Sequence, residues 1–323
     1  MITNLPELRA VIHDLTTASW SLAAIGVLFD SGLAEALVEP RSLDALATAC
    51  PALSPAQIDR VLAVAAVHGI VVIDGPRYRI ADALAPIMRG PMRAALAAEV
   101  RSNLMQPLAL VDAARSTAAP ATTWRHTDPV LLQAQGDASA VIPMMIKNGL
   151  AELAAKLDRP GARFLDIGSG VGAIAIAACR AFPQLRVTGL DPHDKAMELA
   201  RANVARAGLA DRVELRSIKI EELADDRVFA AAWLPAFFIP LPNLPAAIAR
   251  AVASLEPGGW LMVGFPGAGD AKQRAVWGLI AEMWGGPTPA PSTVEDLLRT
   301  AGLRDVRTLP GAPWAPQLVA GVR

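Results

Sequence analysis

The chain has few cysteines, few aromatic side chains and few charges. Its 323 residues include two cysteines, 5% aromatic residues and 19% charged residues, and 31 Asp plus Glu nearly balance 30 Lys plus Arg. A net charge of −1 argues against a nucleic-acid partner, because proteins that bind polyanions usually carry a basic excess. With 53% hydrophobic residues, the chain is too apolar to stay disordered. Its length predicts two domains with a core each.

Signals for disulfides, metal sites, membrane spans and secretion are also missing. Cys50 and Cys179 lie far apart in apolar segments, which is typical of a reducing compartment, and they form no zinc-binding spacing. The apolar run 20–29 is about half as long as the roughly 20 residues that a bilayer requires. The start of the chain lacks a basic region and a cleavable apolar core. We therefore expect a cytoplasmic protein with no metal and no membrane partner, whose apolar surplus serves a homodimer interface.

The first 90 residues predict helices followed by a hairpin. A first helix is expected from Asn4 and a second over 17–37. Ser42 and the pair Ser54-Pro55 predict two further helix starts. Two short β-rich runs then flank the turn Asp74-Gly75-Pro76. This order of elements is typical of a winged helix.

The pattern then changes from helices alone to alternating strands and helices. Apolar strands separated by amphipathic helices are typical of a parallel sheet that is covered on both faces. The sequence therefore predicts a winged-helix dimerisation domain (1–90), a helical connector (91–157) and an α/β domain (158–323). Strands are expected at 163–167, 186–190, 213–217, 228–234, 260–265, 306–309 and 317–322, and the last two are expected to pair antiparallel at the sheet edge.

The first of these strands runs into a glycine-rich turn flanked by acidic residues. Gly168, Gly170 and Gly172 directly precede a helix, so backbone amides and a helix N-terminus face a ligand. The spacing differs from the G-x-G-x-x-G of dinucleotide-binding enzymes. Asp166 beside the glycines would repel a diphosphate but accept hydrogen bonds from an ammonium group. Asp191 ends the second strand, where a carboxylate accepts both hydroxyls of a ribose. A ligand with a ribose and a cationic amino-acid arm is S-adenosylmethionine (SAM).

Four motifs in the chain closely resemble those of class I SAM-dependent methyltransferases. With its N-terminal part included, the chain resembles bacterial small-molecule methyltransferases that dimerise through an N-terminal domain. The resemblance implies a Rossmann-like sheet of seven strands with one antiparallel strand, SAM at the carboxyl ends of the strands and a substrate pocket roofed by the connector. It also implies methyl transfer to a small organic metabolite with release of S-adenosylhomocysteine. The four motifs lie at 164–172, 189–192, 200–213 and 255–261.

The resemblance assigns roles to individual positions. Ser217 and Ile218 depart from the Gly-Asp or Asp-Phe that is usual beside the adenine, so an ordinary strand end is the alternative there. Pro192 and His193 are expected either along the adenine or in a solvated loop. Gln135 is expected to touch SAM. By position, the resemblance implies that the methionine arm is bound by Asp166, Gly168, Ser169 and Gly170, and the ribose by Asp191. It implies that the adenine lies beside Ser217 and Ile218. The floor of the transfer site is implied to be formed by Trp233 and Leu234.

The segment after the fourth strand departs from many O-methyltransferases of this architecture. Those enzymes carry a His-Asp pair there, whereas residues 235–242 of this chain contain no ionisable group. An apolar floor excludes water and cradles a cation or a flat substrate, but it does not act as a general base. We therefore expect transfer to a nitrogen, a stabilised carbon or an already acidic oxygen, driven by alignment. Phe237 and Phe238 belong either to this pocket or to the core.

The chain has four histidines, two of which are candidates for catalysis. His126 lies near Trp124 in the connector, and it is the best available proton acceptor, with a solvated loop as the alternative. His13 lies in the first helix, which in such dimers can reach the partner's pocket. We therefore name His126, Trp233 and His13 as catalytic candidates, and Trp124, Phe237 and Phe238 as candidates for the substrate pocket.

Three other functions are compatible with parts of the sequence. A SAM-dependent cyclase of this fold would release methylthioadenosine without an acceptor. A transcription regulator would use the winged helix to read DNA, but the helix predicted over 54–68 carries only Asp59 and Arg60 as charges. A degenerate scaffold would bind SAM without turnover, and the intact glycines and both acids argue against a loss of binding.

Overall fold

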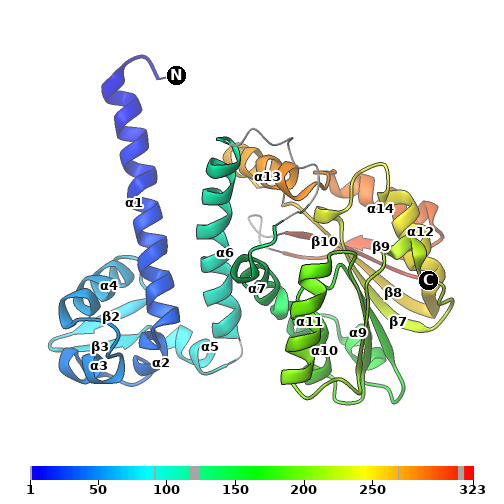
Figure 1. Ribbon diagram of the computed structural model, residues 1–323, viewed down its shortest axis with the longest axis horizontal. Helices are drawn as coiled ribbons and strands as arrows, with labels where there is room; N and C mark the ends of the chain where they lie inside the picture. Colours follow the sequence, from blue (N-terminus) through cyan, green and yellow to red (C-terminus); the bar gives the residue numbers. More distant parts are fainter. Residues whose placement is uncertain (1, 91, 116–123, 125, 268, 312–315) are drawn as a thin grey trace. The chain divides into compact units, whose positions relative to one another are not determined.

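The computed structural model describes residues 2–90, 92–115, 124, 126–267, 269–311 and 316–323. By its internal contacts the chain divides into two units, Met1–Arg115 and Ser116–Arg323 (Figure 1). The division falls inside the segment 91–157 that the sequence predicts as a connector. Each unit has a hydrophobic core of its own.

The first unit begins with one long helix where the sequence predicts two. Helix α1 (Leu5–Asp30) starts at Asn4, whose side chain accepts a hydrogen bond from the Glu7 amide. The expected break near residue 17 is wrong. Residues 7–25 contain no Gly or Pro that would interrupt a helix. The hydroxyls of Thr16 and Thr17 donate to the backbone carbonyls one turn earlier, at 2.8 and 3.0 Å, instead of capping a new helix.

The remaining elements of the first unit follow the predicted order. Ser42 caps α3, and Ser54 and Gln57 form a capping box at α4. The hairpin β2–β3 is present, and the two-residue strand β1 pairs with β3. The elements are α2 (Leu33–Ala36), β1 (Arg41–Ser42), α3 (Leu43–Ala49), α4 (Pro55–Val67), β2 (Val71–Asp74), β3 (Arg77–Ile80), α5 (Ala85–Arg89) and α6 (Met92–Ala113).

The second unit contains a seven-stranded sheet in the order β6-β5-β4-β7-β8-β10-β9. Only β10 runs antiparallel to its neighbours, β8 and β9, which confirms the predicted α/β fold class with one antiparallel strand. Strands β4 and β5 lie at the predicted positions, β7 is shifted by one residue, and β8 begins at Leu255, earlier than the predicted residue 260. The strands are β4 (Arg163–Ile167), β5 (Arg186–Leu190), β6 (Val213–Arg216), β7 (Phe229–Pro235), β8 (Leu255–Phe265), β9 (Arg304–Thr308) and β10 (Gln317–Val322).

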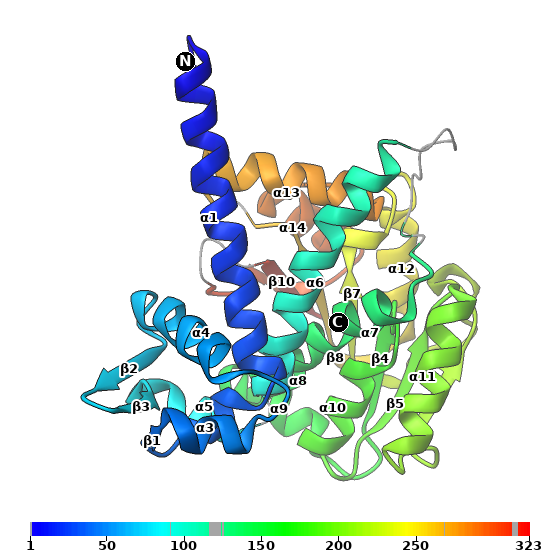
Figure 2. The ribbon, with the colours of Figure 1, turned by 60° about the vertical axis from the view of Figure 1, so that its left-hand side comes forward.

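Helices cover both faces of this sheet, as the continuous apolar strands predict. Phe164 of β4 packs into a core with α9 and α10, and its neighbour Leu165 packs into the opposite core with α12 and α14. Helices α10 and α11 lie side by side (Figure 2). The helices are α7 (Pro129–Ala138), α8 (Ile142–Gly149), α9 (Ala151–Leu157), α10 (Ala173–Ala181), α11 (Asp194–Arg206), α12 (Leu244–Ser254), α13 (Ala271–Trp284) and α14 (Pro291–Thr300).

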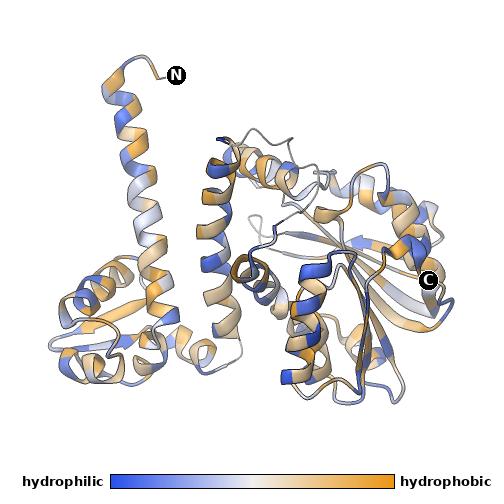
Figure 3. Cartoon of the chain, in the orientation of Figure 1, coloured by the Kyte–Doolittle hydropathy of each residue, from blue (hydrophilic) through white to orange (hydrophobic). Residues whose placement is uncertain are grey.

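Most of α1 is exposed although much of it is apolar. Leu8, Ile12, Leu15 and Trp20 are all exposed, with Trp20 at 73%. Figure 3 shows hydrophobic and hydrophilic residues interleaved along the helix. By length and mean hydropathy alone, α1 meets the criterion for a helix that crosses a membrane. A helix that packs against protein meets the same criterion, and we keep the expectation of a protein partner for this surface.

Candidate active site

The glycine-rich turn lies at the carboxyl edge of the parallel sheet, between β4 and α10. Gly168 and Gly172 have φ values of 66° and 80°, which residues with a side chain rarely adopt. Gly172 is also the N-cap of α10, so the loop leads directly into a helix N-terminus. A Cβ atom on Gly168 would lie 3.1 Å from Pro235 Cγ, which shows how closely the end of β7 approaches the loop.

Asp191 connects this loop to the end of β5. Its Oδ2 accepts a hydrogen bond from the Gly170 amide at 2.8 Å, and its Oδ1 accepts one from the His193 amide at 2.8 Å. Burial raises the pKa of Asp191, and these two N–H donors oppose that rise. The Ser169 amide also donates to the Leu190 carbonyl at 2.9 Å. The carboxylate is thus held by backbone groups, and each oxygen keeps acceptor capacity for a ligand hydroxyl.

Asp166 is the fully buried acid at the end of β4. Neither carboxylate oxygen accepts a hydrogen bond of regular geometry from a described residue, and the nearby Ala175 amide of α10 only opposes the rise in the pKa of this acid. Burial, together with the nearby charge of Asp191, raises the pKa of Asp166 to about 8. A buried polar group without a partner is rare and calls for a ligand or water. This carboxyl therefore fits the ammonium end of SAM, directly or through water.

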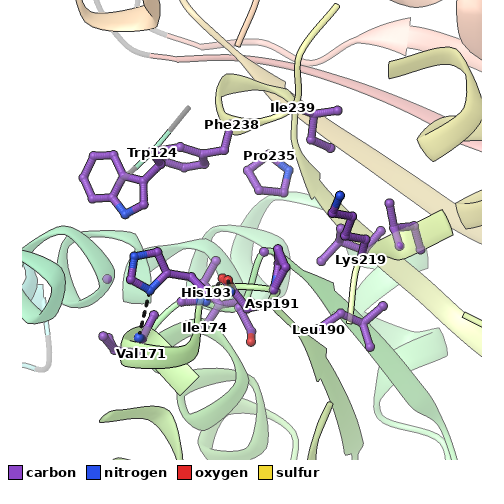
Figure 4. A pocket seen from close by; sticks show the side chains of 18 of the residues that line it. Trp124, Val171, Ile174, Leu190, Asp191, His193, Lys219, Pro235, Phe238 and Ile239 are labelled. Carbon is purple, nitrogen blue, oxygen red and sulfur yellow. Dashed lines mark hydrogen bonds between the residues drawn. The ribbon is translucent and has the colours of Figure 1, made fainter. Parts of the chain in front are cut away.

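The loop and Asp191 border a cavity of about 470 Å³, a size common for small-molecule sites, whereas Asp166 is fully buried and is not part of the cavity lining. Figure 4 shows Asp191, His193 and Ile174 along one side and Trp124, Phe238 and Pro235 along the other. Of the residues predicted for SAM and substrate, the following line the cavity: Gln135, Gly168, Ser169, Gly170, Asp191, Pro192, Ile218, Trp124 and Phe238.

Other predicted residues lie elsewhere. Ser217 is exposed, and its hydroxyl accepts a hydrogen bond from Arg201 at 2.9 Å. Trp233 packs into the core on the α10 side and Leu234 into the core on the α12 side. Because both faces of this sheet are covered by helices, the strands reach the cavity only with their last residues, such as Ile167, Leu190 and Pro235. Trp233 lies beside Asp166 in the β4–β7 pairing.

An aromatic cluster forms the wall that follows β7. Trp124 contacts Phe238 and Trp284, with ring centroids 5.3 and 6.1 Å apart, and Phe238 stacks on Trp284 at 5.0 Å. Phe237 is buried, and its ring contacts Phe238, Trp277 and Trp284. We call Trp124, Phe237, Phe238, Trp277 and Trp284 the aromatic wall. It joins segments that are far apart in the sequence, and the two tryptophans of α13 were not predicted to lie near the site.

The candidate histidines differ in their surroundings. His126 is half-buried with its ring 4.5 Å from Trp124, and burial lowers its pKa. It does not itself line the cavity. His13 is exposed on α1 in the first unit. His193 lines the cavity, and its Nδ1 accepts a hydrogen bond from the Ala196 amide at 3.2 Å, which caps α11.

Sequence reasoning missed several polar groups that line the cavity. Lys219 and Glu221 follow β6, and Asn243 precedes α12. Lys219 and Glu221 could have been predicted from the sequence because they follow the end of a strand. No such sequence signal points to Asn243. Within the described part of the chain, no group of three or more His, Cys, Asp or Glu side chains is placed to hold a metal ion.

Part of the chain is similar in sequence to known methyltransferases. Residues 164–259 match the family described as a methyltransferase domain. A release factor glutamine methyltransferase from Gloeobacter violaceus is 34% identical over 116 residues, which are 35% of this chain and 35% of the relative. The chain thus spans about a third of the length of that curated relative.

Two solved structures share the fold over almost the whole chain. Human N-acetylserotonin methyltransferase in complex with SAM has a TM-score of 0.67 at 14% identity, and the match covers 100% of this chain and 99% of that one. CalO1, a methyltransferase of calicheamicin biosynthesis with S-adenosylhomocysteine bound, has a TM-score of 0.59 at 19% identity, with 99% of each chain covered. At these identities the likeness concerns the fold.

Proposed function

Since residues 164–259 belong to a class I methyltransferase domain, we propose that this chain transfers a methyl group from SAM to a small organic acceptor and releases S-adenosylhomocysteine. The matched domain confirms the identification made from the sequence motifs, and with it SAM as the cofactor. The observation that carries the proposal is the pair of acids around the glycine turn, of which Asp166 is fully buried and Asp191 is half-buried at the cavity. Asp166 accepts no hydrogen bond of regular geometry from a described residue, and Asp191 is held ready by two amides.

Different residues of the chain would bind SAM and position the acceptor. When bound, SAM supplies a methyl group on a positively charged sulfur. Asp166 would balance the ammonium charge, Asp191 would accept the ribose hydroxyls, and the loop amides would fix the methionine arm. Phe238 and Trp124 would exclude water and hold the acceptor in line with the methyl group.

The aromatic wall supports an acceptor that needs little help from a base. Among the described residues that line this side of the cavity, such as Trp124, Pro235 and Phe238, none is ionisable. A nitrogen lone pair, a stabilised carbanion or an acidic oxygen is nucleophilic without a strong base. Where the acceptor loses a proton, we propose that His126 takes it through a water molecule, because its lowered pKa keeps the imidazole neutral near pH 7.

The decisive experiment is product analysis with candidate acceptors. The protein is incubated with SAM alone and with a panel of small aromatic and heteroaromatic amines and acidic phenols, and products are identified by mass. A gain of one methyl group with release of S-adenosylhomocysteine only in the presence of an acceptor supports the proposal. Methylthioadenosine formed without acceptor would establish the cyclase instead.

We further propose that the protein is a cytoplasmic homodimer formed through its N-terminal unit. The support is the exposed apolar surface of α1, which includes Leu8, Ile12 and Leu15. Light scattering on the purified protein is expected to give twice the chain mass. A change of Leu15 to Asp, compared with a change of the exposed Asp14 to Ala, is expected to shift that mass to the monomer.

A further inference from the structure

One helix of the second unit packs directly on the glycine turn. Gln135 and Gly136 of α7 line the cavity, as does Ser139 just beyond this helix. A Cβ atom on Gly136 would overlap Val171 Cγ2, so the helix and the turn are in close contact at this point. Leu132 of α7 also packs with Val171 and Ala173 in a small apolar cluster. The position of α7 therefore determines one side of the cavity.

A buried asparagine joins α7 to the same turn. Asn203, in the last turn of α11, is only 8% exposed. Its Nδ2 donates both to the Val171 carbonyl at 2.9 Å and to Gln133 Oε1 of α7 at 3.0 Å. Its Oδ1 accepts from Arg206 at 3.0 Å. The side-chain amide thus joins α11, its own helix, to the glycine turn and to α7.

The chemistry of the partners fixes the orientation of this amide. The Val171 carbonyl only accepts hydrogen bonds and Arg206 only donates them, so the nitrogen of Asn203 must face Val171. Gln133 then presents its oxygen to Asn203, and its nitrogen donates to Asp137 at 2.9 Å. The hydrogen bonds run in one direction from a cation to an anion, an arrangement that strengthens each of them.

Resting on the proposed function, we propose that Asn203 is a positioning residue that couples the glycine turn to α7, so that SAM binding and the placement of the α7 wall depend on each other. Asn203 does not touch the cavity itself. It acts through Val171, which follows Gly170 in the turn, and through Gln133, which lies about one helical turn before Gly136 in α7. Helix α7 lies beside α10 and α11 (Figure 2).

A role in folding alone makes a different prediction. Any buried asparagine with three hydrogen bonds contributes to stability, and its loss lowers the free energy of unfolding. Stability alone leaves the affinity of the folded molecules for a ligand unchanged. Coupling instead weakens the ligand affinity of the folded protein, because part of the binding free energy is then used to order the turn and α7.

The test uses the full chain and S-adenosylhomocysteine, which does not react. Its dissociation constant is measured by calorimetry for the wild type, Asn203→Ala, Gln133→Ala and the double variant, at a temperature where urea titration shows each to be folded. Asn148→Ala, at an exposed asparagine on α8, is the matched control. Hydrogen exchange of the segment 129–138 is followed with and without the ligand.

We expect Asn203→Ala to weaken binding at least about fivefold, with a smaller loss for Gln133→Ala. The double variant is expected to resemble Asn203→Ala, because both changes break one bridge. Ligand is expected to protect 129–138 in the wild type and in Asn148→Ala, but much less in Asn203→Ala. Unchanged affinity and protection in Asn203→Ala would overturn the inference, and if that variant does not fold, the same criteria apply to Gln133→Ala. Failure of the wild type to bind would instead refute the proposed cofactor.

Discussion

The two sides of the cavity are built in different ways. On the cofactor side, a turn and two acids lie within 166–193, and backbone amides hold Asp191 and the turn together. On the acceptor side, the aromatic wall brings together residues 124, 237–238, 277 and 284 through ring contacts. The first side suits a ligand of fixed shape and charge. The second is an apolar surface that accommodates different flat molecules.

This difference predicts that mutations on the two sides of the cavity change different measured quantities. Changes on the cofactor side are expected to weaken SAM binding whatever the acceptor. Changes on the aromatic wall or at His126 are expected to reduce turnover while SAM affinity stays nearly constant.

The largest effect on SAM affinity is expected from Asp191→Ala. The change removes the acceptor of the ribose hydroxyls and leaves the Gly170 and His193 amides without their partner. Two hydrogen bonds to a charged group correspond to about a hundredfold loss of SAM affinity. The dissociation constant of SAM is measured by calorimetry, and Asp194→Ala, at the exposed start of α11, is the control. An unchanged dissociation constant would remove Asp191 from the site.

A loss of about a hundredfold in turnover is expected for His126→Ala with an acceptor that loses a proton. Because burial lowers the pKa of His126, the wild-type rate is expected to persist below pH 6.5 and to fall only where the imidazole becomes protonated. The pH–rate profile of the wild type and the rate of His68→Ala, at an exposed histidine, complete the measurement. If His126→Ala retains the full rate and profile, His126 is not the proton acceptor.

Asp166→Asn is expected to weaken SAM binding about tenfold and to change its proton balance. With a pKa of about 8, Asp166 is mostly protonated at pH 7 before binding, and a nearby ammonium group lowers this pKa. Binding to the wild type is therefore expected to release most of a proton, seen as different calorimetric heats in phosphate and Tris buffers. Equal proton release by wild type and Asp166→Asn would place the titrating group elsewhere.

The smallest effect is expected on the aromatic wall. Phe238→Ala removes one ring that lines the cavity, while Trp124 and Trp284 remain, so turnover is expected to fall only about fivefold and SAM affinity to change less than twofold. The exposed Leu241 offers a control of the same kind, Leu241→Ala. A large loss of SAM affinity in Phe238→Ala would show that the two sides of the cavity are not independent.

The sequence by itself determined the sheet, the turn and the two acids. Strand and helix periods, glycines at positive φ and acids at strand ends are local signals, and a parallel sheet brings the carboxyl ends of its strands to one edge. The continuous α1 was predicted as two helices, and the hydroxyls of Thr16 and Thr17 at the expected break bond back to the preceding turn. Whether a threonine hydroxyl caps a new helix or bonds back within a longer one depends on the whole helix and not on one residue.

Only the tertiary structure decided which apolar and amide side chains meet. Trp233 and Phe238 are five residues apart, yet one is core and the other cavity wall, because the strand ends between them. Trp277 and Trp284 joined the aromatic wall, and Asn203 joined Gln133 and Val171. Contacts between distant segments depend on how helices pack on the sheet. Residue spacing along the chain carries no record of that packing.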